Sequence, residues 1–306
     1  VIVPNLVTHY YAAVLDGIED YASKQGYSVI SANSHEDHTR EERALDNFLN
    51  MHVEGIIACL AQDTVDYSHF EQLHDMSIPL VFFARCCLED KFSQVVANGD
   101  VAAQEATQHM IETGSKRIAF IGGPNNLDMV RRRKHGYLEA LRENRIMIDR
   151  DLVVCDKIDF EVARNNTLRL LEGPNPPDAI LAFNDIITYA AFDAIKAKGL
   201  RIPQDVAIIG FTDGDTAAFV GDGIGIAIII EECLHTKAIK TVEPGLGAKP
   251  HVTLLVFEYG VHLTVAQTVS IGKTSKIYRP VCTNCSTGQQ LHRQQKHHED
   301  AFQKLS

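Results

Sequence analysis

Residues 1–220 alternate short apolar stretches with longer stretches in which apolar side chains recur every three or four positions. The short stretches predict strands, and the longer ones predict amphipathic helices. The predicted strands span residues 1–3, 28–32, 55–59, 80–83, 117–121, 152–155, 179–182 and 206–209. The predicted helices span residues 13–24, 40–51, 102–113, 133–143, 161–171 and 186–198. This alternation favours parallel sheets with helices on both faces, which is the α/β class.

The break in this alternation near residues 95–100 predicts a division into two lobes. The pattern loses its helix between Phe83 and Val101. Eight strands could form one wide sheet or two narrower ones. The missing helix favours two sheets, because a chain that leaves one sheet for another needs no helix packed back on the first.

The segment KGLRIPQDVAIIGFTDGD at residues 198–215 is the most informative part of the chain. Gly199 suits the left-handed conformation that ends a helix. Residues 206–209 are apolar on both faces, as in a strand covered by helices on each side. Gly210 is expected to let the backbone turn at the carboxyl end of that strand. Asp213 would then reach the sheet edge where open α/β sheets bind ligands.

Composition narrows the possible classes of protein. The chain has 306 residues, of which 45% are hydrophobic and 23% charged, as in ordinary globular proteins. Its net charge of −11 repels phosphate, so this chain alone is a poor nucleic-acid binder. The longest apolar run, residues 224–230, is strand-sized, so we expect no membrane span. Because the chain begins inside a predicted strand, we expect it to be a fragment that lacks an N-terminal part.

The cysteines and the search for catalytic motifs give weaker signals. Seven scattered cysteines favour a reducing cytoplasm over a disulfide framework, although a processed secretion signal would leave no trace. Cys282 and Cys285 form one CxxC with histidines nearby, which is poor evidence for zinc, so we predict no metal and no cofactor. The chain contains no GxxxxGK[ST] and no GxSxG, and we expect it not to be an enzyme.

Several motifs in residues 1–220 together resemble the effector-binding core of the LacI/GalR family of transcription regulators. They include the 198–215 segment, VEGII at 53–57, and Asn184-Asp185 before a predicted helix. Arg133 with Gly136-Tyr137 and Ala140-Leu141 fits the family pattern R-x-x-G-(F/Y)-x-x-A-L. The resemblance covers about seventy per cent of the chain.

The resemblance implies two flavodoxin-like parallel-sheet lobes of the periplasmic-binding-protein-like type I, with a ligand cleft between them. The lobes would span residues 1–97 and 98–220. The cleft would bind a small sugar-like or nucleobase-like effector. The domain would form a homodimer and contact DNA only through a helix-turn-helix headpiece that precedes this chain.

The same resemblance implies five effector-binding residues, Tyr10, Arg85, Arg133, Asn184 and Asp213. Each has a structural alternative. The ring of Tyr10 would stack on the effector or only pack at the helix end. Arg85 follows Ala84, where the family has an acid, so it could be an ordinary residue at a strand end. Asp213 would accept hydrogen bonds from hydroxyl groups or cap a turn.

The alternatives on the second lobe are similar. Arg133 would donate several fixed hydrogen bonds to the effector, or belong with Arg131 and Arg132 to a solvated basic run. Asp185 is the expected N-cap of the following helix, which leaves Asn184 for the ligand.

The resemblance stops at Val220, and residues 221–306 form an atypical tail. A frameshift and a genuine replacement both explain this loss of pattern. The Ile-rich run at 224–230 is expected either to form a strand that crosses back to the first lobe or to pack poorly. Residues 252–258 and 261–270 resemble strands, and 286–306 a polar tail.

Two other functions remain open from the sequence. A periplasmic sugar-binding protein of a transport system shares the two-lobed plan. An α/β enzyme could use Asp213 and a histidine in the cleft.

Overall fold

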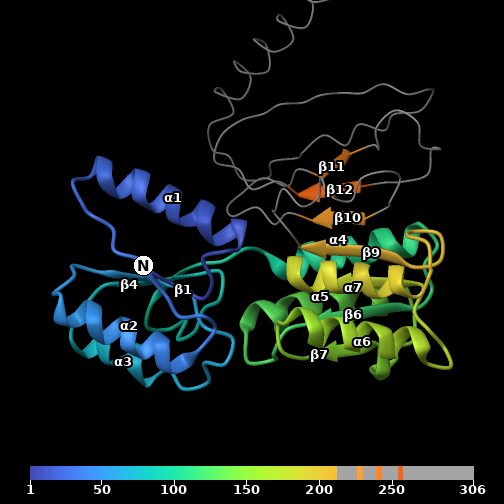
Figure 1. Cartoon of the computed structure of the whole chain (residues 1–306), viewed down its shortest axis with the longest axis horizontal. Helices are drawn as coiled ribbons and strands as arrows, with labels where there is room; N and C mark the ends of the chain where they lie inside the picture. The colour runs from blue at the N-terminus through green and yellow to red at the C-terminus, as the bar shows by residue number, and fades with distance from the viewer. Residues whose placement is uncertain (212–225, 230–238, 243–253, 258–306) are drawn as a thin grey trace, which may run out of the picture.

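The computed structural model describes residues 1–211, 226–229, 239–242 and 254–257 of the chain. It has two five-stranded parallel sheets, one in each of two lobes (Figure 1). This arrangement confirms the predicted α/β class and the two-lobed architecture. The predicted lobe limits at residues 97 and 220 stay predictions.

The first lobe contains a sheet of order β2-β1-β3-β4-β5. Its strands are β1 (Ile2–Val3), β2 (Ala32–Asn33), β3 (Ile56–Ala58), β4 (Leu80–Phe83) and β5 (Ser93–Val95). Its helices are α1 (His9–Lys24), α2 (His38–Asn50) and α3 (Ser68–Asp75). The sequence analysis missed α3 and β5 because both are short, and it placed the second strand too early.

The second lobe contains a sheet of order β10-β9-β8-β6-β7. Its strands are β6 (Ile118–Gly122), β7 (Val153–Cys155), β8 (Ala179–Ala182), β9 (Ala207–Phe211) and β10 (Ile226–Ile229). Its helices are α4 (Gly99–Glu112), α5 (Asp128–Glu143), α6 (Phe160–Glu172) and α7 (Asp185–Ala197), with a 3-10 turn at Arg150–Leu152.

The Ile-rich run forms strand β10, but its expected return to the first lobe is wrong. Ile226–Ile229 pairs in parallel with β9, so it extends the sheet of the second lobe. The open edge of β9 accepts the strand that follows it in the sequence. A second pair of strands, β11 (Ile239–Val242) and β12 (Leu254–Phe257), is antiparallel. β12 lies within the strand predicted at 252–258, whereas 261–270 and 286–306 lie outside the described residues.

The two sheets are covered to different extents. In the second lobe, one buried cluster includes Ile121, Ile180 and Ile187, and another includes Phe120 and Tyr137. Apolar packing on both faces explains why the strands of this lobe read as continuous apolar runs. No helix in the described part of the chain is long and apolar enough to cross a membrane.

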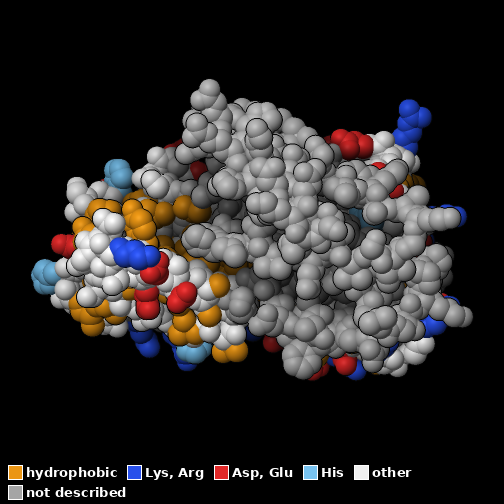
Figure 2. Space-filling view, turned by 90° about the horizontal axis from the view of Figure 1, so that it is seen from above, with side chains coloured by type: hydrophobic (Ala, Val, Ile, Leu, Met, Phe, Trp, Pro, Cys, Tyr) orange, Lys and Arg blue, Asp and Glu red, His pale blue; other side chains and the backbone are white. Residues whose placement is uncertain are grey.

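In the first lobe, α1 is the least buried of the helices that flank the sheet. Tyr11 and Leu15 are its buried side chains among those described, and Tyr21 is 69% exposed. Figure 2 shows hydrophobic side chains gathered on the surface of this lobe. The opposite face of the sheet packs a larger cluster around Phe48, Phe70 and Phe82.

Two glycines allow a close approach of helices in the second lobe. A Cβ atom on Gly136 of α5 would overlap the Asp100 carbonyl oxygen of α4, so only glycine lets these helices touch at this point. A Cβ on Gly210 would overlap the Thr188 side chain of α7. Gly210 therefore does not turn the backbone, as the sequence suggested, because β9 continues through it to Phe211. Gly199 does adopt the predicted left-handed conformation, with φ of 70°.

We expect Gly136→Ala to lower the free energy of unfolding by about 1–3 kcal/mol, the usual cost of overpacking. Gly17→Ala is the matched control, because Gly17 also lies within a helix but no atom lies within 4 Å of its added Cβ. Alanine is the better helix former, so this control should gain up to about 1 kcal/mol. Urea denaturation of both variants measures the difference. An equal gain in the free energy of unfolding for the two variants would contradict the close contact between Gly136 and Asp100.

Candidate ligand-binding cleft

A pocket lies between the carboxyl ends of strands from both lobes. It has a cavity volume of about 100 Å³, which rises to about 760 Å³ when the open mouth is included. The first lobe lines it with Asn5, Thr8, Tyr10, Tyr11, Glu36, Ala84 and Arg85. The second lobe lines it with Met129, Arg133, Ile158, Phe183, Asn184, Asp185, Ile186 and Phe211. The carboxyl ends of parallel strands are the usual place for a ligand in open α/β sheets.

The structure brings four of the five predicted site residues to this one pocket. Tyr10, Arg85, Arg133 and Asn184 all line it, although they lie on four different elements or loops. Asp213, the fifth, lies outside the described residues. That these residues bind an effector stays a prediction at this point.

Arg133 is fixed between two aromatic rings of the second lobe. Its guanidinium carbon lies 4.0 Å from the centre of the Phe211 ring and 4.7 Å from that of Phe183. The guanidinium also donates a hydrogen bond to the Phe183 carbonyl oxygen. The side chain is buried, so Arg133 does not belong to a solvated basic run. Cation–π contacts of this kind orient the charged group as well as stabilise it.

Asn184, not Asp185, caps helix α7. Its side-chain oxygen accepts a hydrogen bond from the Ile187 amide at 3.1 Å, and Asp185 is the first residue of the helix. The predicted capping role of Asp185 is therefore wrong. A cap must stand one residue before the first helical turn, and here the helix begins at Asp185, one residue earlier than that prediction requires. Both side chains lie on the pocket wall.

Arg85 is held by protein groups rather than by solvent. Its Nη1 donates to Glu36 Oε2 at 2.6 Å and to the Leu60 carbonyl oxygen at 3.2 Å, and the residue is only 5% exposed. Burial disfavours its charge, but nearby groups including Tyr11 and Glu36 outweigh burial, so the pKa of Arg85 is raised. Arg85 is therefore a structural anchor on the pocket wall.

Glu36 is a lining residue that the sequence analysis missed. It accepts the Arg85 bond and another from the Gln62 amide at 2.8 Å. Its backbone has a φ of 61°, which a glutamate rarely adopts. Strained backbone of this kind gathers at functional sites. No motif in the sequence marks this position.

Two adjacent tyrosines of α1 form the first-lobe side of the mouth. The Tyr11 hydroxyl accepts a weak hydrogen bond from the Cys59 thiol at 3.6 Å, and burial raises the pKa of Tyr11. Burial also raises the pKa of the Cys59 thiol, to about 11. The Tyr10 ring stands edge-on to Tyr11, with ring centres 5.1 Å apart. Tyr11 thus anchors the helix end, and Tyr10, half-buried, lines the pocket.

Hydrogen bonds join the lobes beside the pocket. Gln62 Oε1 accepts from the Ile158 amide at 2.8 Å. Asn126 Nδ2 donates to the carbonyl oxygens of Gln62 and Thr64 at 2.9 and 3.0 Å. Asp128 Oδ1 accepts from the Cys86 amide at 3.2 Å. The lobes are therefore in direct contact at the pocket edge.

Comparison with known proteins identifies the family. Residues 1–216 match the family model for periplasmic binding proteins and the sugar-binding domain of the LacI family. The chain therefore belongs to this family. Its known relatives place it with the LacI/GalR regulators, which confirms the resemblance inferred from the sequence.

Two curated relatives illustrate the similarity. The HTH-type transcriptional repressor CytR of Escherichia coli K12 is 29% identical over 219 residues, which are 72% of this chain and 64% of CytR. Catabolite control protein A of Priestia megaterium is 30% identical over 69% of this chain and 63% of its own length. The chain thus spans under two thirds of the length of these two relatives.

Solved structures agree with this assignment. The crystal structure of CcpA of Lactococcus lactis superimposes with a TM-score of 0.64 at 30% identity, covering 68% of this chain and 76% of that protein. A complex of the regulator CelR with cellobiose has a TM-score of 0.62 at 28% identity, covering 69% of this chain and 65% of CelR.

We expect Arg85→Ala to lower the free energy of unfolding by about 1–3 kcal/mol, because it leaves the partly buried Glu36 carboxylate, whose side chain is 19% exposed, without its charged partner. Arg142→Ala is the control, since Arg142 pairs with Glu139 on the surface, where its side chain is 54% exposed. Surface pairs contribute at most about 1 kcal/mol. Chemical denaturation of both variants tests this, and equal losses would show that Arg85 is not an anchor.

Proposed function

We propose that this chain is the effector-binding part of a LacI-type transcription repressor. The observation that carries the proposal is the convergence of Tyr10, Arg85, Arg133 and Asn184 on one pocket between two lobes. The effector is a small sugar-like or nucleobase-like molecule. The cellobiose complex of CelR supports a sugar.

The pocket chemistry fits a polar ring compound. Tyr10 and the Phe183–Arg133–Phe211 stack offer flat surfaces to a ring. The Asn184 side chain and the Arg133 guanidinium offer hydrogen-bonding groups from the opposite wall. Aromatic faces with a few placed polar groups are typical of small-molecule sites.

Binding would act through the orientation of the lobes. The cavity volume of about 100 Å³ is below the roughly 300–1,000 Å³ of most ligand sites, so the lobes part to admit the effector. Parting of the lobes breaks or lengthens the hydrogen bonds that Gln62, Asn126 and Asp128 form between them. An effector that binds one lobe orientation better than another shifts the population toward it.

The regulator acts on DNA through a headpiece outside this chain, as a homodimer in the cytoplasm. The acidic charge of −11 agrees with a body that does not itself bind DNA. The relatives favour a regulator over a periplasmic transport protein or an enzyme, because CytR is a transcriptional repressor. The gene sequence upstream of Val1 decides between the first two, since a helix-turn-helix supports the regulator and a signal peptide the transport protein.

We expect Arg133→Ala to weaken effector binding by about 1–3 kcal/mol, the usual loss for a hydrogen bond to a charged group. Calorimetry with a panel of mono- and disaccharides and nucleosides measures the loss. Arg142→Ala is the control, because Arg142 lies on the same helix but outside the pocket lining. Asp213→Asn should show a similar loss if Asp213 reaches the site. Unchanged affinity in both Arg133→Ala and Asp213→Asn would remove these residues from the site.

A further inference from the structure

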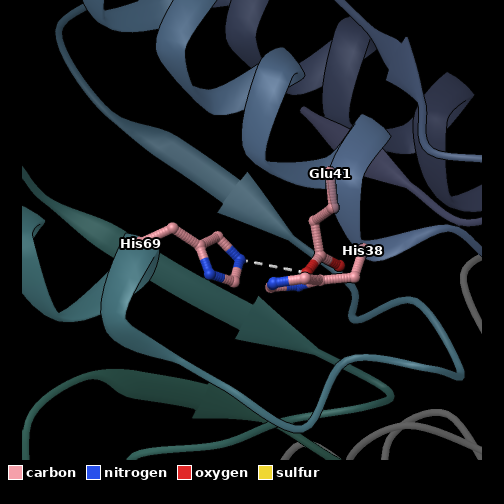
Figure 3. Close-up of side chains that lie close together, drawn as sticks. All are labelled: His38, Glu41 and His69. Carbon is pink, nitrogen blue, oxygen red and sulfur yellow. Dashed lines mark hydrogen bonds and ion pairs between the residues drawn. The ribbon is translucent and has the colours of Figure 1, made fainter.

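A second cluster of polar side chains lies in the first lobe, apart from the residues that line the cleft. His38 and Glu41 stand one turn apart at the start of α2, and His69 is the second residue of α3. Figure 3 shows the three side chains converging from these two helices. One potential ligand atom from each lies within 4.8 Å of the other two.

The Glu41 carboxylate is the fixed centre of this cluster. It is fully buried and accepts hydrogen bonds from the Ala61 amide at 2.6 Å, the Thr64 hydroxyl at 2.8 Å and His69 Nε2 at 3.0 Å. These bonds tie the loop after β3 to the start of α2. The carboxylate therefore cannot swing away from the two imidazoles.

The imidazoles have nitrogen atoms that the protein does not satisfy. The Nδ1 atoms of His38 and His69 are both buried, and neither has a hydrogen-bond partner among the described residues. The His69 side chain is only 4% exposed. Buried polar atoms normally find a partner, because leaving one unmet is costly. In His69 the unmet atom is Nδ1, whereas Nε2 is the nitrogen that faces Glu41, so the case for a ligand site rests on the convergence of the three side chains.

We propose that His38, Glu41 and His69 bind a divalent transition metal ion, with Zn²⁺ the best fit. Two imidazoles and one carboxylate are a zinc ligand set, whereas Mg²⁺ and Ca²⁺ prefer oxygen ligands. With zinc–ligand bonds of about 2.0–2.1 Å, tetrahedral ligand atoms lie roughly 3.4 Å apart. The 3.0 Å between His69 Nε2 and Glu41 Oε1 is near that value.

The remaining adjustment falls on the most exposed of the three ligands. The His38 side chain is 28% exposed, and its ring stands edge-on to that of His69, with centres 4.9 Å apart. Its ligand nitrogen lies within 4.8 Å of the other two ligand atoms and would have to move closer to them when zinc binds. The fourth position is left to water.

The metal would lie beside a contact between the lobes. The Thr64 hydroxyl donates to Glu41, while the Thr64 carbonyl oxygen accepts from Asn126 of the second lobe. Metal binding thus fastens the 60–69 loop that carries this contact. The site itself does not depend on what the cleft binds.

Titration of the chelator-treated full chain with ZnCl₂, by calorimetry and by competition with a chromophoric chelator, tests the proposal. All proteins carry Cys282→Ser and Cys285→Ser, so that this CxxC does not contribute zinc sites. We expect one Zn²⁺ per chain and a rise in Tm with zinc. Millimolar MgCl₂ should produce no such rise.

His38→Gln is the decisive variant, because His38 is partly exposed and its loss leaves the Glu41 bonds in place. We expect it, and His69→Gln, to weaken zinc binding at least 10-fold, since even outer-shell changes cost 10–100-fold. His74→Gln on α3 is the matched control, because His74 is 60% exposed and outside the cluster. Circular dichroism confirms that each variant is folded. Full-strength binding by folded His38→Gln, or no zinc binding by the parent chain, would overturn the proposal.

Discussion

The ion pair between the buried Arg85 and the partly buried Glu36 is the interaction on which the geometry of the cleft depends. Arg85 follows β4 and Glu36 follows β2, so the pair joins two loops at the carboxyl edge of the sheet. Arg85 also holds the Leu60 carbonyl oxygen, and Glu36 holds the Gln62 amide. The loops after three strands are therefore fixed by one pair of charges, at a depth where an unpaired charge is costly.

Gln62 carries this constraint to the other lobe. Its backbone N–H donates to the Glu36 carboxylate, and its side-chain oxygen accepts from the backbone N–H of Ile158. Ile158 lines the opposite wall of the cleft. A change in the position of Glu36 therefore acts on a contact between lobes through one residue. Glu36 lines the pocket, so one residue, Gln62, links the pocket wall to a contact between the lobes.

The second lobe forms its wall of the cleft through close packing and aromatic contacts rather than through an ion pair. Its sheet is packed on both faces, and Gly210 lets α7 approach β9 closely enough for Thr188 to contact the strand. That approach sets the start of α7, where Asn184 caps the helix and faces the cleft. Arg133, held between Phe183 and Phe211, completes the wall. The first lobe thus uses buried charge, and the second uses close packing and aromatic contacts.

The sequence by itself determined the succession of most strands and helices along the chain and the sheet edge at which the predicted site lies. Hydrophobic period is a local signal, so it predicted β4 and β8 to the residue. The resemblance to the LacI/GalR family, and not the periodicity, named Tyr10, Arg85, Arg133 and Asn184, which the structure brings to one pocket. Partners far apart in the chain were decided by tertiary structure alone. Glu36 meets Arg85 across 49 positions, and Gln62 meets Ile158 across 96.

The difference between local signals and long-range contacts also explains why the expectations for β10 and Gly210 were wrong. The pairing of β10 with β9 and the contact of Gly210 with Thr188 depend on which surfaces come together. A run of isoleucines indicates a buried strand but not its neighbour, because apolar burial is nondirectional. Hydrogen bonds and close contacts have direction and short range, so their partners exist only once the chain has folded.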